Sequence, residues 1–100
     1  MAKPFIFKIV TPEHVVYQDQ VDFVSLVGVE GSFGVLAGHA PFVTQLSVAT
    51  GYVQQQGKRM SVAIMGGLCK VADGHVTVMT DAAEMNQDIV ALLAREKKRT

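Results

Sequence analysis

Residues that could do chemistry are few in this chain and lie far apart in the sequence. Its histidines, His14, His39 and His75, each stand beside turn-forming residues. A metal site needs several His, Cys or carboxylate ligands at a characteristic spacing, and no such spacing surrounds them. The single cysteine, Cys69, lies in an apolar alternating segment, which favours a buried structural thiol over a nucleophile. The sequence therefore predicts neither a metal site nor a catalytic thiol.

The serines and glycines form no catalytic motif either. Ser25, Ser32 and Ser61 lack any nucleophile-elbow context. The glycines at 28, 31 and 34 do not have the spacing of a dinucleotide fingerprint, and Pro41 leaves no room for the helix that should follow one. No acid–base pair and no nucleophile with a partner is visible. We expect a protein that is not an enzyme and that has no cofactor.

Composition sets further bounds on function. One hundred residues make one domain, or one domain with a short appendage. The net charge is zero, which argues against a nucleic-acid binder or a binder of anionic membranes. The basic segment 95–99 is either the solvated end of a helix or a binding patch. No apolar run approaches the ~20 residues of a membrane span. With no signal peptide visible, these features predict a cytoplasmic protein without direct membrane insertion.

The elements that carry these residues read as short strands separated by turns over the first eighty residues. Phe5, Phe7 and Ile9 alternate with their neighbours, and Asp73-Gly74 is a two-residue hairpin signal. This pattern predicts a mainly β protein, a two-sheet antiparallel β-sandwich or flattened barrel. The predicted strands are 5–10, 15–17, 21–27, 41–46, 51–56, 60–64, 68–71 and 76–80.

The period changes from about residue 81. Met85, Ile89, Leu92 and Leu93 fall on one stripe of a helix. Asp81 with Glu84 has capping-box-like spacing, whereas Asn86 or Asp88 would start the helix later. We therefore predict a sandwich domain over 1–82, and a linker with a single short C-terminal helix over 83–100. A second helix is not expected.

The glycine-rich segment from Glu30 to Pro41 is the most distinctive stretch. Three glycines and a proline among apolar residues predict short strand pieces joined by sharply shaped turns. The string EGSFGVLAGHAP resembles a signature of the epsilon subunit of F-type ATP synthases, E-G-x-[FL]-G-[IV]-[LY]-P-G-H-A-P. Ala37 departs from that pattern, which usually has proline there. On the residues alone, His39 is a turn residue or a binding residue.

The resemblance extends along the chain at matching spacing, from about residue 5 to 88. Residues 8–13 resemble the opening strand and first turn of that family, and 21–28 its third strand. Residues 66–71 and 76–81 resemble its closing strands. The later helix start, at Asn86 or Asp88, is the one that the resemblance favours.

The resemblance implies a non-catalytic central-stalk subunit of a proton- or sodium-translocating synthase. It would couple the gamma subunit to the c subunits of the membrane rotor ring, at the cytoplasmic face of the cell membrane. His39 and Ser32 would contact the ring, although many relatives carry an acidic residue in place of Ser32. One sheet face would pack on gamma, through residues that the resemblance does not identify. Phe33, Val35, Leu36 and Phe42 could belong to the core or to an interface.

Two further expectations concern the C-terminal part. Relatives that bind ATP carry I-D-x-x-R-A at the start of their helical part. Here the matching residues 89–94 read IVALLA, so the acid and the arginine are replaced by Val90 and Leu93. We expect no tight ATP binding, and no action as the long inhibitory latch that two C-terminal helices form in some members. The alternative function is a free-standing β-sandwich module that binds a ligand or peptide at its glycine-rich corner.

Overall fold

Alternation of apolar and other residues builds the strands of this protein. In the first strand Phe5, Phe7 and Ile9 are buried while the residues between them are half-exposed. The structure, a computed structural model, describes residues 3–86. Its strands are β1 (Phe5–Val10), β2 (Val15–Val21), β3 (Phe23–Gly28), β4 (Gly31–Val35), β5 (Phe42–Gln55), β6 (Lys58–Ala72), β7 (His75–Met79) and β8 (Ala83–Asn86).

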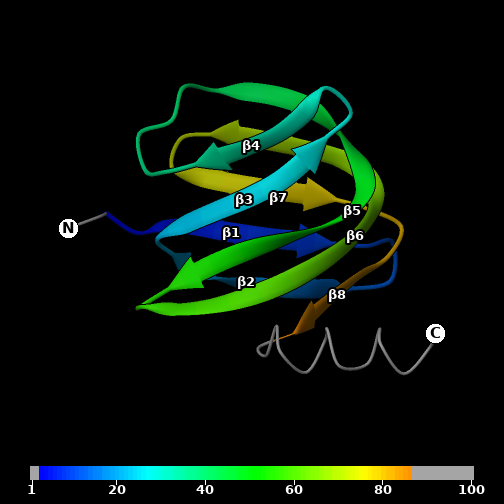
Figure 1. The fold of residues 1–100 in the computed structure, drawn as a ribbon, viewed down its shortest axis with the longest axis horizontal. Coiled ribbons are helices and arrows are strands. Elements are labelled where there is room, and N and C mark those ends of the chain that lie inside the picture. Colours follow the sequence, from blue (N-terminus) through cyan, green and yellow to red (C-terminus); the bar gives the residue numbers. More distant parts are fainter. Residues whose placement is uncertain (1–2, 87–100) are drawn as a thin grey trace.

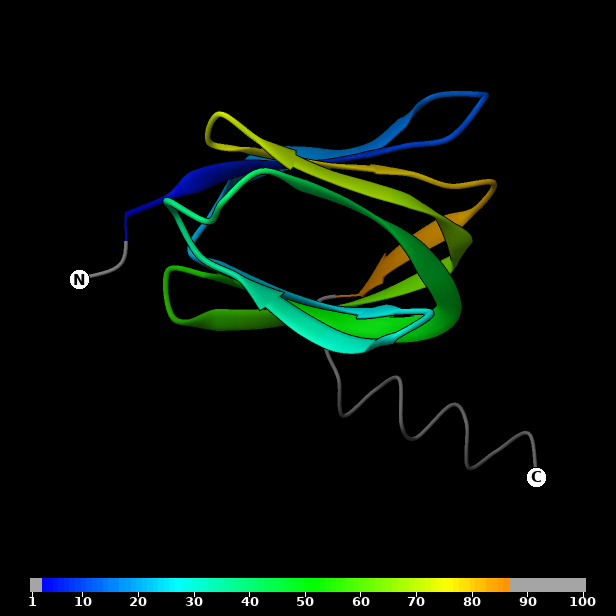
Figure 2. The same cartoon turned by 90° about the horizontal axis from the view of Figure 1, so that it is seen from above.

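The strands form two packed layers because β5 and β6 are long and bend from one layer into the other (Figure 1). Hydrogen-bonded neighbours follow the order β2-β1-β7-β6-β5-β3-β4, and β8 pairs with β6. Figure 2 shows the layers face to face, joined where β5 and β6 turn. The end strands β2 and β4 do not pair with each other in the described chain, so the sheet stays open. The predicted β-sandwich is confirmed, with one parallel pair, β1 with β7.

Two pairs of predicted strands are single strands in the structure. The predicted strands 41–46 and 51–56 are both parts of β5, and 60–64 and 68–71 are both parts of β6. The register between β5 and β6 passes from Leu46 opposite Gly67 to Val48 opposite Met65, so the ladder bends there without ending. Glycines at 66 and 67 adopt positive φ and make this bend. The prediction of two separate strands was therefore wrong in both cases.

The strand β8 corrects the earlier of the two predicted helix starts. Asp81 and Glu84 do not open a helix, because residues 83–86 are extended and pair with β6. Ala83 and Met85 pack on the core while Glu84 is exposed, which is the period of a strand. Met85, the first residue of the predicted helical stripe, lies in this strand instead. A helix that begins after Asn86 or Asp88, the stripe from Ile89 onward and residues 89–94 lie outside the described residues. The division into 1–82 and 83–100 stays a prediction, although β8 extends the sheet past residue 82.

The core lies between the two layers and is almost wholly apolar. Cys69 is completely buried in it, and burial raises the pKa of its thiol to about 11, so the predicted structural thiol is confirmed. The Tyr17 ring packs on Phe7 with centroids 6.0 Å apart, and its buried hydroxyl has no hydrogen-bond partner in residues 3–86. The buried apolar residues are Phe5, Phe7, Ile9, Val21, Val24, Leu26, Val35, Leu46, Val53, Met60, Val62, Ile64, Cys69, Val71, Val76 and Val78.

Tight turns fix the ends of the layers. Asp73 and Gly74 both have positive φ, the geometry of a two-residue hairpin turn, so the predicted hairpin is confirmed. Gln56 and Gly57 form a second turn of this kind between β5 and β6. The Gln56 backbone N–H donates to the Asp22 carboxylate at 2.9 Å, which ties this hairpin to the corner between β2 and β3.

Candidate partner-binding surfaces

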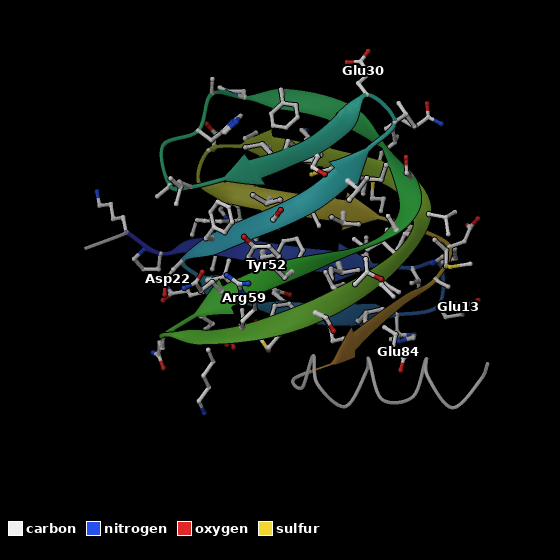
Figure 3. All side chains as sticks on the ribbon, viewed as in Figure 1. Glu13, Asp22, Glu30, Tyr52, Arg59 and Glu84 are labelled. Atoms are coloured by element: carbon white, nitrogen blue, oxygen red, sulfur yellow. The ribbon has the colours of Figure 1, made fainter. Side chains whose placement is uncertain are left out.

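Ser32 lies on β4, the last strand of the sheet path, where it is exposed. It stands opposite Val27 of β3 in the register of that pair. A shallow depression of about 320 Å³ is lined by Ser32 together with Glu30 and Phe42. Glu30 projects from the β3–β4 turn at the upper edge of the molecule (Figure 3). An acidic residue is therefore present beside Ser32, two positions earlier in the chain, which the sequence reasoning missed.

His39 is exposed in the loop between β4 and β5. Its backbone N–H donates to the Leu36 carbonyl at 3.2 Å, and its Nδ1 lies 2.7 Å from the Ala40 carbonyl oxygen. Its ring packs on Phe42, with centroids 4.9 Å apart. Ser32 lines the same depression as Phe42. The two residues predicted to contact the rotor ring, Ser32 and His39, therefore both lie near this one aromatic side chain. The histidine thus has a turn role and an accessible ring.

The apolar residues around this loop divide between core and surface. Val35 is buried, and Phe33 and Phe42 are half-buried against the core with their rings edge to face at 5.4 Å. Leu36 and Val43 are 53% and 62% exposed. The exposed residues around this loop are Ser32, Leu36, His39 and Val43, and we call this set the loop edge. In Figure 1, β4 and the start of β5 lie at the top, with the loop between them at the upper left.

A second apolar surface crosses the outward face of the layer that contains β1, β2 and β7. Leu68 on β6 pairs with Met79 on β7, Met79 lies opposite Val10 on β1, and Val10 lies opposite Val15 on β2. Three of these side chains are 43–48% exposed, and Val10 is half-exposed. We call this set the apolar row: Val10, Val15, Leu68 and Met79. Its two middle members, Val10 and Met79, line a shallow depression of about 360 Å³ that Gly67 also borders.

The sequence analysis did not find the apolar row. Each member stands at an outward position of its strand, next to an inward residue such as Ile9, Cys69 or Val78. Two adjacent apolar residues in a strand indicate that both faces of the sheet are covered by other parts of the protein or by a partner. Only the pairing of strands distant in the sequence shows that these positions line up.

The outward face of the other layer is different in kind. Phe23 and Tyr52 have ring centroids 5.8 Å apart, and the Arg59 guanidinium lies over the Tyr52 ring at 4.1 Å (Figure 3). The positive charge of Arg59 is thus already engaged by an aromatic face of the same chain. This arrangement is a self-contained stack, unlike the apolar row.

The remaining histidines have local partners. His14 closes the turn after β1, where its backbone N–H donates to the Thr11 hydroxyl at 3.3 Å. The Nδ1 of His75 lies 2.9 Å from the Asp73 carbonyl oxygen. Within residues 3–86 no three His, Cys, Asp or Glu side chains are grouped as metal ligands would be. Nor does this part of the chain contain a helix long and apolar enough to cross a membrane.

Comparison with known sequences gives one family. Residues 4–86 match the model of the ATP synthase, Delta/Epsilon chain, beta-sandwich domain. The ATP synthase epsilon chain of Nitratidesulfovibrio vulgaris is 41% identical over 98 residues, which are 98% of this chain and 73% of that protein. The ATP synthase epsilon chain of Desulforamulus reducens is 43% identical over 98 residues, 98% of this chain and 74% of that protein.

Solved structures agree with this match. A chain in the F1/c-ring part of the Euglena gracilis mitochondrial ATP synthase superposes with a TM-score of 0.78 at 29% identity, over 96% of this chain and 62% of that chain. A chain of the central stalk and c-ring of the Tetrahymena thermophila mitochondrial ATP synthase shares the fold, with a TM-score of 0.67 at 12% identity. This chain therefore belongs to the ATP synthase delta/epsilon family, as a non-catalytic epsilon subunit built on that family's β-sandwich domain.

Proposed function

We propose that this chain couples the gamma subunit of the synthase to the c subunits of the rotor ring. The observation that carries the proposal is the presence of two separate exposed surfaces, the apolar row and the loop edge, on one folded unit. The similarity to a chain of an F1/c-ring assembly supports it. A coupling element needs two contacts held at a fixed distance, and a close-packed sandwich transmits force between them with little deformation.

The apolar row is the proposed gamma contact. Its members come from four neighbouring strands and form a continuous band on a sheet face. Monomeric proteins rarely leave such bands open to water, and burial of apolar area contributes about 25 cal/mol per Å². An exposed band on a sheet is suited to a partner with an extended, complementary surface. Burying Leu68 and Met79 there would supply the centre of an interface.

The loop edge is the proposed contact with the rotor ring. Ser32 and His39 are exposed polar residues at this border, and Glu30 adds a carboxylate in the depression that Ser32 lines. Polar loops of the ring would meet hydrogen-bonding groups here, with Leu36 and Val43 supplying apolar contact. Glu30, which the family signature also contains, supplies one negative charge at this edge, but it does not replace the acidic residue that many relatives carry at the position of Ser32.

The location follows from this assembly. The chain would be held at the cytoplasmic face of the cell membrane, as a peripheral component of the ATP synthase. The proposal needs neither nucleotide binding nor membrane insertion by this chain.

Purification of the tagged chain from its own cells, in mild detergent, tests the proposal against a free-standing ligand-binding module. We expect gamma and the c subunits to be recovered together with the chain. Recovery of a monomer that carries a small metabolite or peptide, and no synthase subunit, would support the alternative instead.

A further inference from the structure

Two lysines, Lys8 on β1 and Lys70 on β6, lie beside the apolar row, each two residues along its strand from a member of that row. Lys8 on β1 lies opposite Thr77 on β7, and Thr77 lies opposite Lys70 on β6. Both lysines are flanked by buried residues on their strands, so their own side chains project outward from the exposed face of the sheet. Neighbouring strands are about 4.8 Å apart, which puts the two lysine backbones about 10 Å apart.

Asp19 of β2 stands opposite the inward residue Phe7, off the outward face, and the other acidic residues near this face lie beyond the ends of its strands. Glu13 and Asp81 are at the end where the apolar row lies (Glu13 is labelled in Figure 3), and Asp73 is in the turn between β6 and β7. The side chains of Lys8 and Lys70 make no ion pair or hydrogen bond with another residue of the described range 3–86. Asp73 does line a depression with Lys70, at the far end of the face. This face therefore carries two positive side chains without an ion-pair partner in residues 3–86, although the net charge of the whole chain is zero.

Lysines on one side of the apolar row make the surface asymmetric. A band of apolar side chains alone would accept a partner in either of two opposite orientations. Charged groups at the border of an interface add little affinity, but they steer association and exclude wrong orientations. A partner with carboxylates on one side of its apolar surface would dock in a single direction.

We propose that Lys8 and Lys70 select a partner surface with two carboxylates, about 10 Å apart, beside an apolar band. This inference rests on the proposed function, in which gamma is the partner, and it adds the charge pattern that gamma must present. A lipid surface fits less well, because binding to anionic membranes usually needs clusters of 4–8 basic residues.

The test measures association of the purified chain with the gamma subunit of the same organism, at about 0.05 M and 0.5 M salt. The double variant Lys8→Glu with Lys70→Glu is expected to lower the association rate at low salt about tenfold. At high salt its rate should approach that of the wild type. The control is Lys3→Glu with Lys58→Glu, which changes net charge equally at exposed positions outside the face. Its association rate should change less than about twofold.

The outcomes separate this inference from the proposed function. If the wild type binds gamma and both double variants associate with it at equal rates, the charge proposal is overturned and the coupling role stands. Failure of the wild type to bind gamma would overturn both. Binding to vesicles rich in anionic lipid that depends on the two lysines, without binding to gamma, would also overturn the charge proposal. If the charge-reversed chain does not fold, Lys8→Gln with Lys70→Gln serves instead, with a loss of salt dependence as the expected result.

Discussion

Replacing Gly67 by alanine is expected to unfold most of this domain. Gly67 has a φ of +111°, which residues with a Cβ rarely adopt. A Cβ built there would overlap the carbonyl oxygen of Met79 on β7, which is backbone and has no rotamer to change. Loss of this close approach would separate β6 from β7 where the two layers join. We expect about 3–5 kcal/mol of lost stability, a large share of what a small domain has.

Gly74→Ala is the matched control. Gly74 also has positive φ, at +75°, but a Cβ built there meets no atom within 4 Å. The control should therefore cost about 1 kcal/mol, the expense of the backbone conformation alone. Urea unfolding of both variants, followed by circular dichroism, measures the difference. Equal midpoints for the two variants would show that the contact with Met79 contributes nothing.

A second large effect is expected on assembly and not on folding. Leu68→Asp with Met79→Asp changes two side chains that are 44% and 43% exposed, so the isolated chain should keep its fold. In the complex both carboxylates would be buried in the centre of the gamma interface without partners. Each such burial costs several kcal/mol. Since 1.4 kcal/mol is tenfold in affinity, binding to gamma should weaken by at least about a hundredfold.

The control for this variant is Val48→Asp with Met65→Asp. These residues face each other across β5 and β6, and they are at least as exposed as the first pair. They lie outside the apolar row, so we expect less than about a threefold change in affinity, which is below 1 kcal/mol. Equal losses for both pairs, measured by titration calorimetry, would contradict the assignment of the apolar row as the contact.

The sequence predicted those parts of the fold that depend on neighbouring residues. Alternation placed Phe7 and Ile9 inside, and Asp73-Gly74 supplied the residues that a hairpin turn requires. The continuity of β5 and β6 was missed, because a glycine that bends a paired strand looks like one that ends it. The strand β8 was missed because its pairing partner is about twenty residues away, and a short segment has too few residues to show its period.

The two surfaces were predictable to different degrees. Ser32 and His39 were named from the resemblance, and the structure shows that both border Phe42. The apolar row could not be read from the sequence, because it exists only once β6, β7, β1 and β2 lie side by side. The parallel pairing of β1 with β7, which sets Met79 opposite Val10, joins segments about seventy residues apart.

Cross-linking in the assembled synthase tests most directly the claim that one sandwich touches both partners. Single cysteines would be placed by Ser32→Cys on the loop edge and by Met79→Cys in the apolar row. The native Cys69 is buried with a pKa of about 11, so it should stay unreactive. A reagent with one thiol-reactive and one photoreactive end then reports the neighbour of each position.

We expect the cysteine at position 32 to link to a c subunit and the cysteine at position 79 to link to gamma. Position 57, in the hairpin turn between β5 and β6 and outside both surfaces, should link to neither through Gly57→Cys. Links from position 57 to a c subunit, with none from position 32, would contradict the proposed orientation. Absence of links from both 32 and 79 in a fully assembled enzyme would contradict the coupling role itself.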